Sequence, residues 1–159
     1  MDIGQLLATW LHTVAFVIAW GYYGVLARMI LPGLERSVDL AARPGVVVAI
    51  ERRALPLVLG SMIIFIATGT YLLVVNPHYA GLGDVFDSTW TTLMFVKHGL
   101  VVVLVALGVL VDVAIRGAGE ATTDADRAAG LRRIHLETEI LTGLGALIAL
   151  LTVAAQLAT

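Results

Sequence analysis

Three side chains that can bind a metal or a charged cofactor lie close together in the segment from Trp90 to Val101. Met94 and His98 are four residues apart, so they share one face of a helix. Lys97 directly precedes His98 and points about 100° away from it around a helix. Imidazole nitrogen and thioether sulfur are metal ligands, whereas an ammonium group pairs with anions. The segment therefore predicts a binding site with His98 as a ligand and Lys97 as a counter-charge.

The composition around this segment is that of a membrane protein. The chain has 159 residues, of which 59% are hydrophobic and 14% are charged, against roughly 45–50% and 25% in soluble domains. We therefore expect an integral membrane protein whose direct partner is the lipid bilayer. Ionisable groups are costly at membrane depth, which makes Lys97 and His98 functional candidates. No basic patch indicates nucleic acid, and the lack of cysteine excludes thiolate ligands.

Four apolar segments predict an all-α integral membrane fold. We place transmembrane helices at about residues 5–31, 53–76, 89–116 and 130–158 of a single domain, residues 1–159. Each has about the 20 residues that cross ~30 Å of hydrocarbon, and lipid does not tolerate unpaired backbone groups. Pro56 would lie in the first turn of the second helix, where proline is tolerated. The expected architecture is an up-down-up-down four-helix bundle with a flexible loop at Gly117 to Leu131.

The arginines predict the orientation of this bundle. They flank the first and third loops, whereas the loop from Asn76 to Thr89 and both terminal tails contain no arginine or lysine. By the positive-inside rule, both termini are extracytoplasmic. Trp10 and Trp90 would then lie in the outer aromatic belt. We expect a multi-pass protein of the cell membrane, such as a prokaryotic inner membrane.

Two histidines have matching depths in this arrangement. His12 lies about two turns into the first helix and His98 about two turns into the third, both counted from the outer side. Two imidazoles on facing helices of a bundle can bind haem iron as axial ligands. We therefore predict a haem b site with His12 and His98 as ligands. Lys97 would pair with a haem propionate, or else with Asp84 or Asp87.

Each of these residues also has a purely structural interpretation. His12 can be a buried histidine bonded to a neighbouring helix, Met94 can be packing, and Lys97 can extend towards the interface. The small residues of the same helices either admit a flat macrocycle or allow close helix packing: Ala15, Ala19, Gly21, Gly24, Gly60, Ala67, Gly69 and Gly99.

A second group of polar residues lies at the predicted cytoplasmic side. His135, Glu137 and Glu139 follow a pair of arginines, and we expect a charged turn at the start of the fourth helix, where the helix N-terminus favours acids. A proton path or a second ligand set stays open for them. Asp112 and Arg116 are spaced for an ion pair.

Two segments resemble known families. The first, Trp10-Leu-His12-Thr-Val-Ala-Phe-Val-Ile-Ala-Trp20-Gly21, resembles the opening helix of the copper-resistance D family and of HemJ-type protoporphyrinogen oxidases. The second, Phe95-Val-Lys97-His98-Gly-Leu-Val-Val, is similar to their later helix with a lysine before an aliphatic run. The resemblance implies a small helical membrane protein that binds haem b, with His12 and Lys97 matching the important positions of the oxidases. Those families are not defined by a Lys-His pair.

Four functions are compatible with these features. The first is a haem b protein with an electron-transfer or redox role, with a redox partner or a quinone. The second is a HemJ-like oxidase, and the third is copper transport or resistance through Met94, His98, His12 and His78. The fourth is a non-catalytic membrane anchor subunit, and a homo-oligomer is compatible with each. The haem hypothesis accounts for the matched depth of the histidines, which copper does not require.

Overall fold

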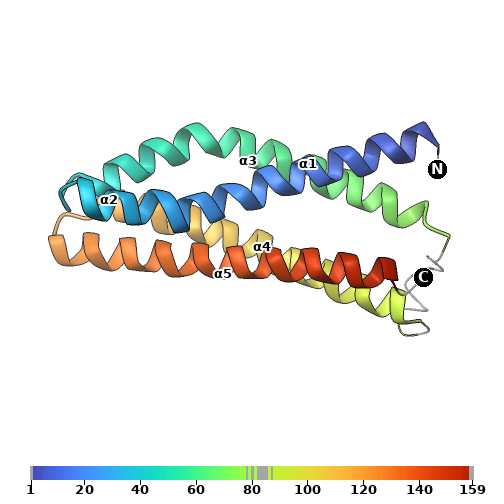
Figure 1. Ribbon diagram of the computed structural model, residues 1–159. Helices are drawn as coiled ribbons and strands as arrows, with labels where there is room; N and C mark the ends of the chain where they lie inside the picture. Colours follow the sequence, from blue (N-terminus) through green and yellow to red (C-terminus); the bar gives the residue numbers. More distant parts are fainter. Residues whose placement is uncertain (1, 78, 80, 82–85, 87, 158–159) are drawn as a thin grey trace.

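Four long helices make up the computed structural model, which describes residues 2–77, 79, 81, 86 and 88–157 (Figure 1). Each is long and apolar enough to cross a membrane, and no strand occurs in these residues. For the described residues, the prediction of an all-α fold with four helices long and apolar enough to span a membrane is confirmed. The elements are α1 (Ile3–Val25), the π-helical turn η1 (Leu26–Ile30), α2 (Leu31–Ser37), α3 (Arg43–Val74), α4 (Thr89–Glu120) and α5 (Asp124–Leu157). Because η1 and α2 directly continue α1, these three elements form the first long helix.

Polar side chains cap the N-termini of three of the helices. The carboxylate of Asp2 accepts a hydrogen bond from the backbone N–H of Gln5 at the start of α1. Ser88 and Thr91 form a capping box at the start of α4. The hydroxyl of Thr123 accepts a hydrogen bond from the N–H of Asp126 at the start of α5. Each contact satisfies a backbone donor that the helix itself leaves unpaired.

The helices associate in two pairs. α1 packs mainly against α3, and α4 packs mainly against α5. Figure 1 shows the two pairs close together at the end that carries α2 and farther apart at the other end. The first helix begins and the last helix ends at this second end of the bundle (Figure 1).

The helices extend beyond the apolar segments from which they were predicted. α3 begins at Arg43 and not near residue 53, and α5 begins at Asp124 and not near residue 130. Pro56 therefore lies inside α3 and not in its first turn. Only residues 121–123 separate α4 from α5, so most of the expected flexible loop, Gly117 to Leu131, is helical. An apolar run marks only the apolar part of a helix, whereas these extensions also contain charged residues. The extension of α3 buries Pro44, Val47 and Glu51.

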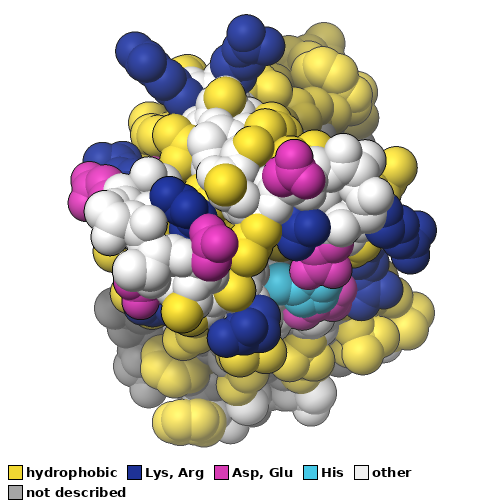
Figure 2. Space-filling model, turned by 90° about the vertical axis from the view of Figure 1, so that its left-hand side faces the viewer, with side chains coloured by type: hydrophobic (Ala, Val, Ile, Leu, Met, Phe, Trp, Pro, Cys, Tyr) yellow, Lys and Arg dark blue, Asp and Glu magenta, His cyan; other side chains and the backbone are white. Residues whose placement is uncertain are grey.

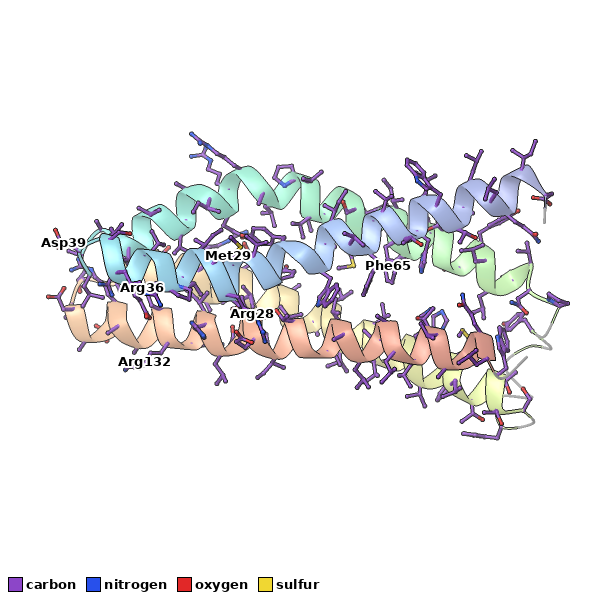
Figure 3. All side chains as sticks on the ribbon, in the orientation of Figure 1. Arg28, Met29, Arg36, Asp39, Phe65 and Arg132 are labelled. Carbon is purple, nitrogen blue, oxygen red and sulfur yellow. The ribbon has the colours of Figure 1, made fainter. Side chains whose placement is uncertain are left out.

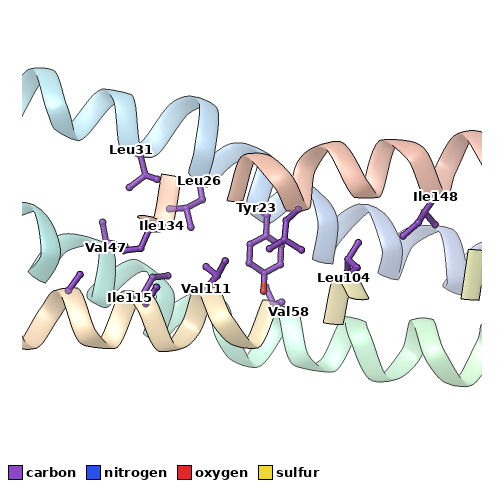
Figure 4. Close-up of a cluster of buried hydrophobic side chains, with 13 residues drawn as sticks. Tyr23, Leu26, Leu31, Val47, Val58, Leu104, Val111, Ile115, Ile134 and Ile148 are labelled. Carbon is purple, nitrogen blue, oxygen red and sulfur yellow. The ribbon is translucent and has the colours of Figure 1, made fainter. Parts of the chain in front are cut away.

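The main hydrophobic core lies towards the α2 end of the bundle (Figure 4). All four long helices contribute side chains that are almost completely buried, at most 1% exposed. They include Leu26, Val47, Val111, Ile115, Ile134 and Leu141. Gly130 permits the close approach of α4 and α5 here, because a Cβ atom on it would lie 2.8 Å from the Cβ of Ala118.

Charged side chains surround this same end (Figure 2). Figure 3 places Arg36, Asp39 and Arg132 there. Arg28 binds Glu139 across two helices at 2.9 Å, and Arg133 binds Glu137 at 2.7 Å. The two glutamates lie well inside α5, so the prediction that the helix N-terminus stabilises their charges is wrong. Arg28 and Arg133 neutralise these charges instead.

The predicted ion pair between Asp112 and Arg116 is confirmed, with a distance of 2.7 Å. It lies near the α2 end, on α4. Close to it, the hydroxyl of Tyr22 donates a hydrogen bond to the carboxylate of Glu51, whose residue is only 5% exposed. This contact joins α1 to α3 inside the bundle.

Trp20 joins α1 to α5 near the middle of the bundle. Its indole N–H donates a hydrogen bond to the carbonyl oxygen of Thr142 at 2.9 Å. The ring lies directly against Gly145, where a Cβ atom would come within 2.2 Å of Trp20 Cδ1. Trp20 therefore has a packing role.

Candidate functional site

A cavity of about 740 Å³ lies between the helix pairs, in the half of the bundle away from α2. This volume is within the range of roughly 300–1,000 Å³ that is common for ligand sites. His12, Met94, Lys97 and His98 all line the cavity. The structure therefore brings together these four predicted site residues, which come from α1 and α4.

His12 is held by α3. Its Nδ1 lies 3.0 Å from the carbonyl oxygen of Phe65 and 3.1 Å from the hydroxyl oxygen of Thr68. The Thr68 hydroxyl donates its own proton to the carbonyl of Ile64, at 2.6 Å. Both neighbours of Nδ1 therefore act as acceptors, so Nδ1 carries the proton and Nε2 keeps its lone pair. This is the helix-bonded histidine of the structural interpretation, and it is also oriented as a metal ligand is.

Phe65 and Gly69 fix the position of this imidazole. The rings of His12 and Phe65 stack with centroids 4.3 Å apart and an interplanar angle of 20°. A Cβ atom on Gly69 would lie 2.8 Å from Cε1 of His12. Phe65 and Gly69 are four residues apart on one face of α3, so the imidazole packs between an aromatic ring and bare backbone. Phe65 lies in the half of the bundle that contains the cavity (Figure 3).

His98 is held within its own helix. Its Nδ1 lies 2.6 Å from the carbonyl oxygen of Met94, one turn earlier. A carbonyl only accepts, so Nδ1 again carries a proton, and in the neutral imidazole Nε2 then has the lone pair. In the part of the chain that the structure describes, neither His12 nor His98 has a hydrogen-bond partner at Nε2.

Lys97 lines the same cavity and is half-buried. Lys97 and His98 both lie close enough to His12 to interact with it electrostatically. Among the described residues, Lys97 has no partner for an ion pair or a hydrogen bond. The expected partners Asp84 and Asp87 lie outside the described residues. A half-buried ammonium at this depth favours an anionic group in the cavity.

The copper alternative rests on a residue that the structure does not describe. Met94 and His98 line the cavity together, but His78 lies outside the described residues. Among described histidines and acidic residues, no group of three or more is placed to hold a metal ion. The copper alternative therefore stays a prediction.

The cavity has polar and apolar parts. Thr9, Asn76 and Gln156 lie towards the end of the cavity that is farther from α2. Thr9 is near the start of α1, Asn76 follows the end of α3, and Gln156 is near the end of α5. The inner part is apolar, formed by Phe65, Val101, Val105 and Ala106. An amphiphile with polar groups at one edge matches this distribution.

Several supporting residues were not identified from the sequence. Phe65 and Thr68 are ordinary residues of an apolar helix, and only contacts between helices give them a role. Trp90 is 6% exposed and lines the cavity, so its expected place in a lipid-facing aromatic belt is wrong. Trp10 is 60% exposed, as a belt residue would be.

Only one of the small residues considered for a macrocycle lines the cavity, namely Gly69. Ala15 and Ala19 are buried, which fits close packing. A Cβ atom on Gly21, Gly60 or Gly99 would meet no atom within 4 Å. Among these small residues, Gly69 alone both lines the cavity and contacts His12.

Comparison of the chain with protein-family models, curated proteins and solved structures gave no match.

Proposed function

We propose that this chain is a multi-pass membrane protein that binds haem b, with His12 and His98 as axial ligands. The observation that carries the proposal is that the two imidazoles have the same tautomer and line the same cavity. Both line one cavity, and both donate Nδ1–H to a backbone carbonyl, so both keep an Nε2 lone pair. Histidines that bind metals are typically oriented in this way through their second nitrogen.

The rest of the cavity supports the same ligand. The apolar inner part suits a porphyrin ring, and Lys97 supplies a positive charge for a propionate. Bound haem would supply one-electron transfer at its iron. His12 and His98 would hold it between α1 and α4, while the apolar walls exclude water from the ring.

The proposal includes a position in the membrane. The arginine-rich end with α2 lies in the cytoplasm, and the cavity lies in the extracytoplasmic half, with an up-down-up-down course and both termini outside. The gathering of charges at the α2 end supports this orientation (Figure 2). A cell-membrane location, a redox partner and a homo-oligomer belong to the same proposal.

An optical spectrum of the purified protein tests haem binding. We expect a Soret band, with sharp alpha and beta bands after reduction. The variants His12→Ala and His98→Ala should each lose most of the haem, while His135→Ala, at the other end of the bundle, should keep it. Added imidazole should restore the spectrum of His98→Gly, which separates ligation from folding. A colourless protein that takes up no added haemin would disprove the proposal.

One observation favours the HemJ-like alternative. Lys97 lies in the cavity without a described partner, beside His12, and these two match the important positions of those oxidases. Rescue of a strain that lacks its own protoporphyrinogen oxidase would support this activity. Failure of rescue by a well-expressed, haem-loaded protein would leave the redox role as the better proposal.

A further inference from the structure

The wall of the cavity is incomplete on the side between α3 and α4. Most lining residues come from these two helices, whereas α1 and α5 contribute few. Val102 of α4 lines the cavity although it is 70% exposed, and Ile66 of α3 lines it although it is 48% exposed. Side chains that face both the cavity and the outside mark its edge. Ile66 and Val102 therefore mark an apolar edge on the α3 and α4 side, whereas the exposed Thr13 of α1 marks a polar edge elsewhere.

The packing of α3 and α4 explains this opening. At the α2 end the two helices share a core, with Val47 and Val58 of α3 in one buried cluster with Val111 and Ile115 of α4 (Figure 4). Towards the other end the helix pairs lie farther apart (Figure 1). The opening therefore lies in the loosely packed half, at the level of the histidines.

The cavity is closed in the direction of the cytoplasmic end. Phe16, Trp20, Leu104 and Ile148 fill the middle of the bundle and leave a void of only about 10 Å³. A ligand can thus reach the histidines from the outer end or from the side. The edge at the side is apolar and lies within the membrane-spanning part of α3 and α4, so acyl chains cover it.

We propose that the cavity is loaded sideways from the bilayer, through the opening between α3 and α4, by an amphiphile with a flat apolar body and an acidic edge. The inference rests on the proposed function, in which this amphiphile is haem b. The apolar edge of the ring passes Ile66 and Val102, and the carboxylates stay near Lys97 at the polar outer part of the cavity. A haem in the membrane therefore reaches its ligands without leaving the lipid.

Uptake kinetics test the route. Haem-free protein in phosphatidylcholine vesicles is mixed with haemin, and the growth of the Soret band is followed. Val102→Trp should slow uptake at least fivefold, with the rate of each variant taken from the approach to its own final amplitude. Val109→Trp is the matched control, because Val109 lies two turns along the same face of α4, is 58% exposed and does not line the cavity. It should take up haemin within twofold of the wild-type rate.

Single cysteines give a second readout that needs no bulky residue. The natural chain has no cysteine, so Val102→Cys and Val109→Cys each carry a single thiol. A lipid-soluble maleimide should label both in haem-free protein. Haemin should slow the labelling of Val102→Cys at least fivefold and leave that of Val109→Cys unchanged.

Each other outcome rejects the inference in a recognisable way. Equal uptake by Val102→Trp and Val109→Trp, or no protection of Val102→Cys, would overturn loading through the opening while haem binding itself stands. Slowing by Gln156→Trp but not by Val102→Trp would assign loading to the outer end. If Val102→Trp does not fold, the protection of Val102→Cys decides. A wild-type protein that never develops a Soret band would reject the proposed function as well.

Discussion

The imidazole of His12 stacks on the ring of Phe65, with centroids 4.3 Å apart, and donates a hydrogen bond to the carbonyl oxygen of the same residue. One residue of α3 thus sets both the plane and the tautomer of a histidine on α1. An imidazole held in this way loses little further freedom when it binds a metal, which favours ligation.

Gly69 completes this support, so its substitution should disturb the site selectively. A Cβ atom in Gly69→Ala would press on Cε1 of His12 at 2.8 Å and displace the imidazole. We expect haem content to fall several-fold, measured from the Soret band per protein. Gly60→Ala in the same helix meets no atom within 4 Å and should bind haem normally. Equal haem content in both variants would contradict the assigned role of Gly69.

Gly145 should be required for stability and not for ligand chemistry. The space of its missing side chain is filled by the indole of Trp20, so Gly145→Ala forces overpacking that costs about 1–3 kcal/mol. The midpoint of thermal unfolding in detergent should fall. In Gly143→Ala the new methyl group meets nothing within 4 Å, and the midpoint should hold or rise. A lower midpoint in both variants would point to a general effect of α5.

The hydrogen bond between Tyr22 and Glu51 should stabilise the α1–α3 pair. Tyr22→Phe leaves a buried acceptor unpaired, which costs about 1–3 kcal/mol. The double variant Tyr22→Phe/Glu51→Leu has neither polar partner, so its loss of stability should be smaller than the sum of the single losses. Additive effects in thermal unfolding would show that the two side chains act independently. Tyr71→Phe, at a residue that is 42% exposed, is the control and should have no effect.

Lys97 should distinguish free from esterified propionates. The wild-type protein should bind haemin several-fold more tightly than haemin dimethyl ester, because only free carboxylates pair with the ammonium group. Lys97→Met should remove this difference and leave the affinity for the ester unchanged. Affinities come from optical titration of haem-free protein. A preference for haemin that persists in Lys97→Met would place the carboxylates elsewhere.

Cysteine accessibility should establish the orientation. Asp2→Cys and Thr123→Cys place single thiols at opposite ends of the bundle, beyond its long helices. In intact spheroplasts, a membrane-impermeant maleimide should label Asp2→Cys. Thr123→Cys should react only after lysis. The reverse pattern would place the cavity in the cytoplasmic half.

The sequence predicted the parts of this structure that depend on periodicity and charge. Four helices follow from the length of apolar runs, and the pair of Asp112 and Arg116 follows from i, i+4 spacing. The helix ends could not be predicted in the same way. The first ten residues of α3, for example, are stabilised by a core that Val47 forms with Ile115 and Ile134, and such contacts between distant segments have no local signal.

In the candidate site, too, the sequence predicts some residues, whereas others are revealed only by contacts between helices. His12, Lys97 and His98 stand out because ionisable groups are rare in apolar runs, and the structure places them around one cavity. Phe65 and Gly69 are indistinguishable in sequence from packing residues, since their role comes from the crossing of α1 over α3. For Trp90 the sequence predicts a place near a helix end but not the rotation of α4 about its axis, which turns this side chain into the cavity.

The association of the helices in two pairs determines when the site can form during biosynthesis. α1 and α3 leave the ribosome first and can pack as a hairpin in the membrane before α4 and α5 are made. His12, Phe65 and Gly69 belong to this first hairpin, whereas Lys97 and His98 belong to the second. Each hairpin therefore carries only half of the site, so the complete cavity forms only after the two hairpins dock.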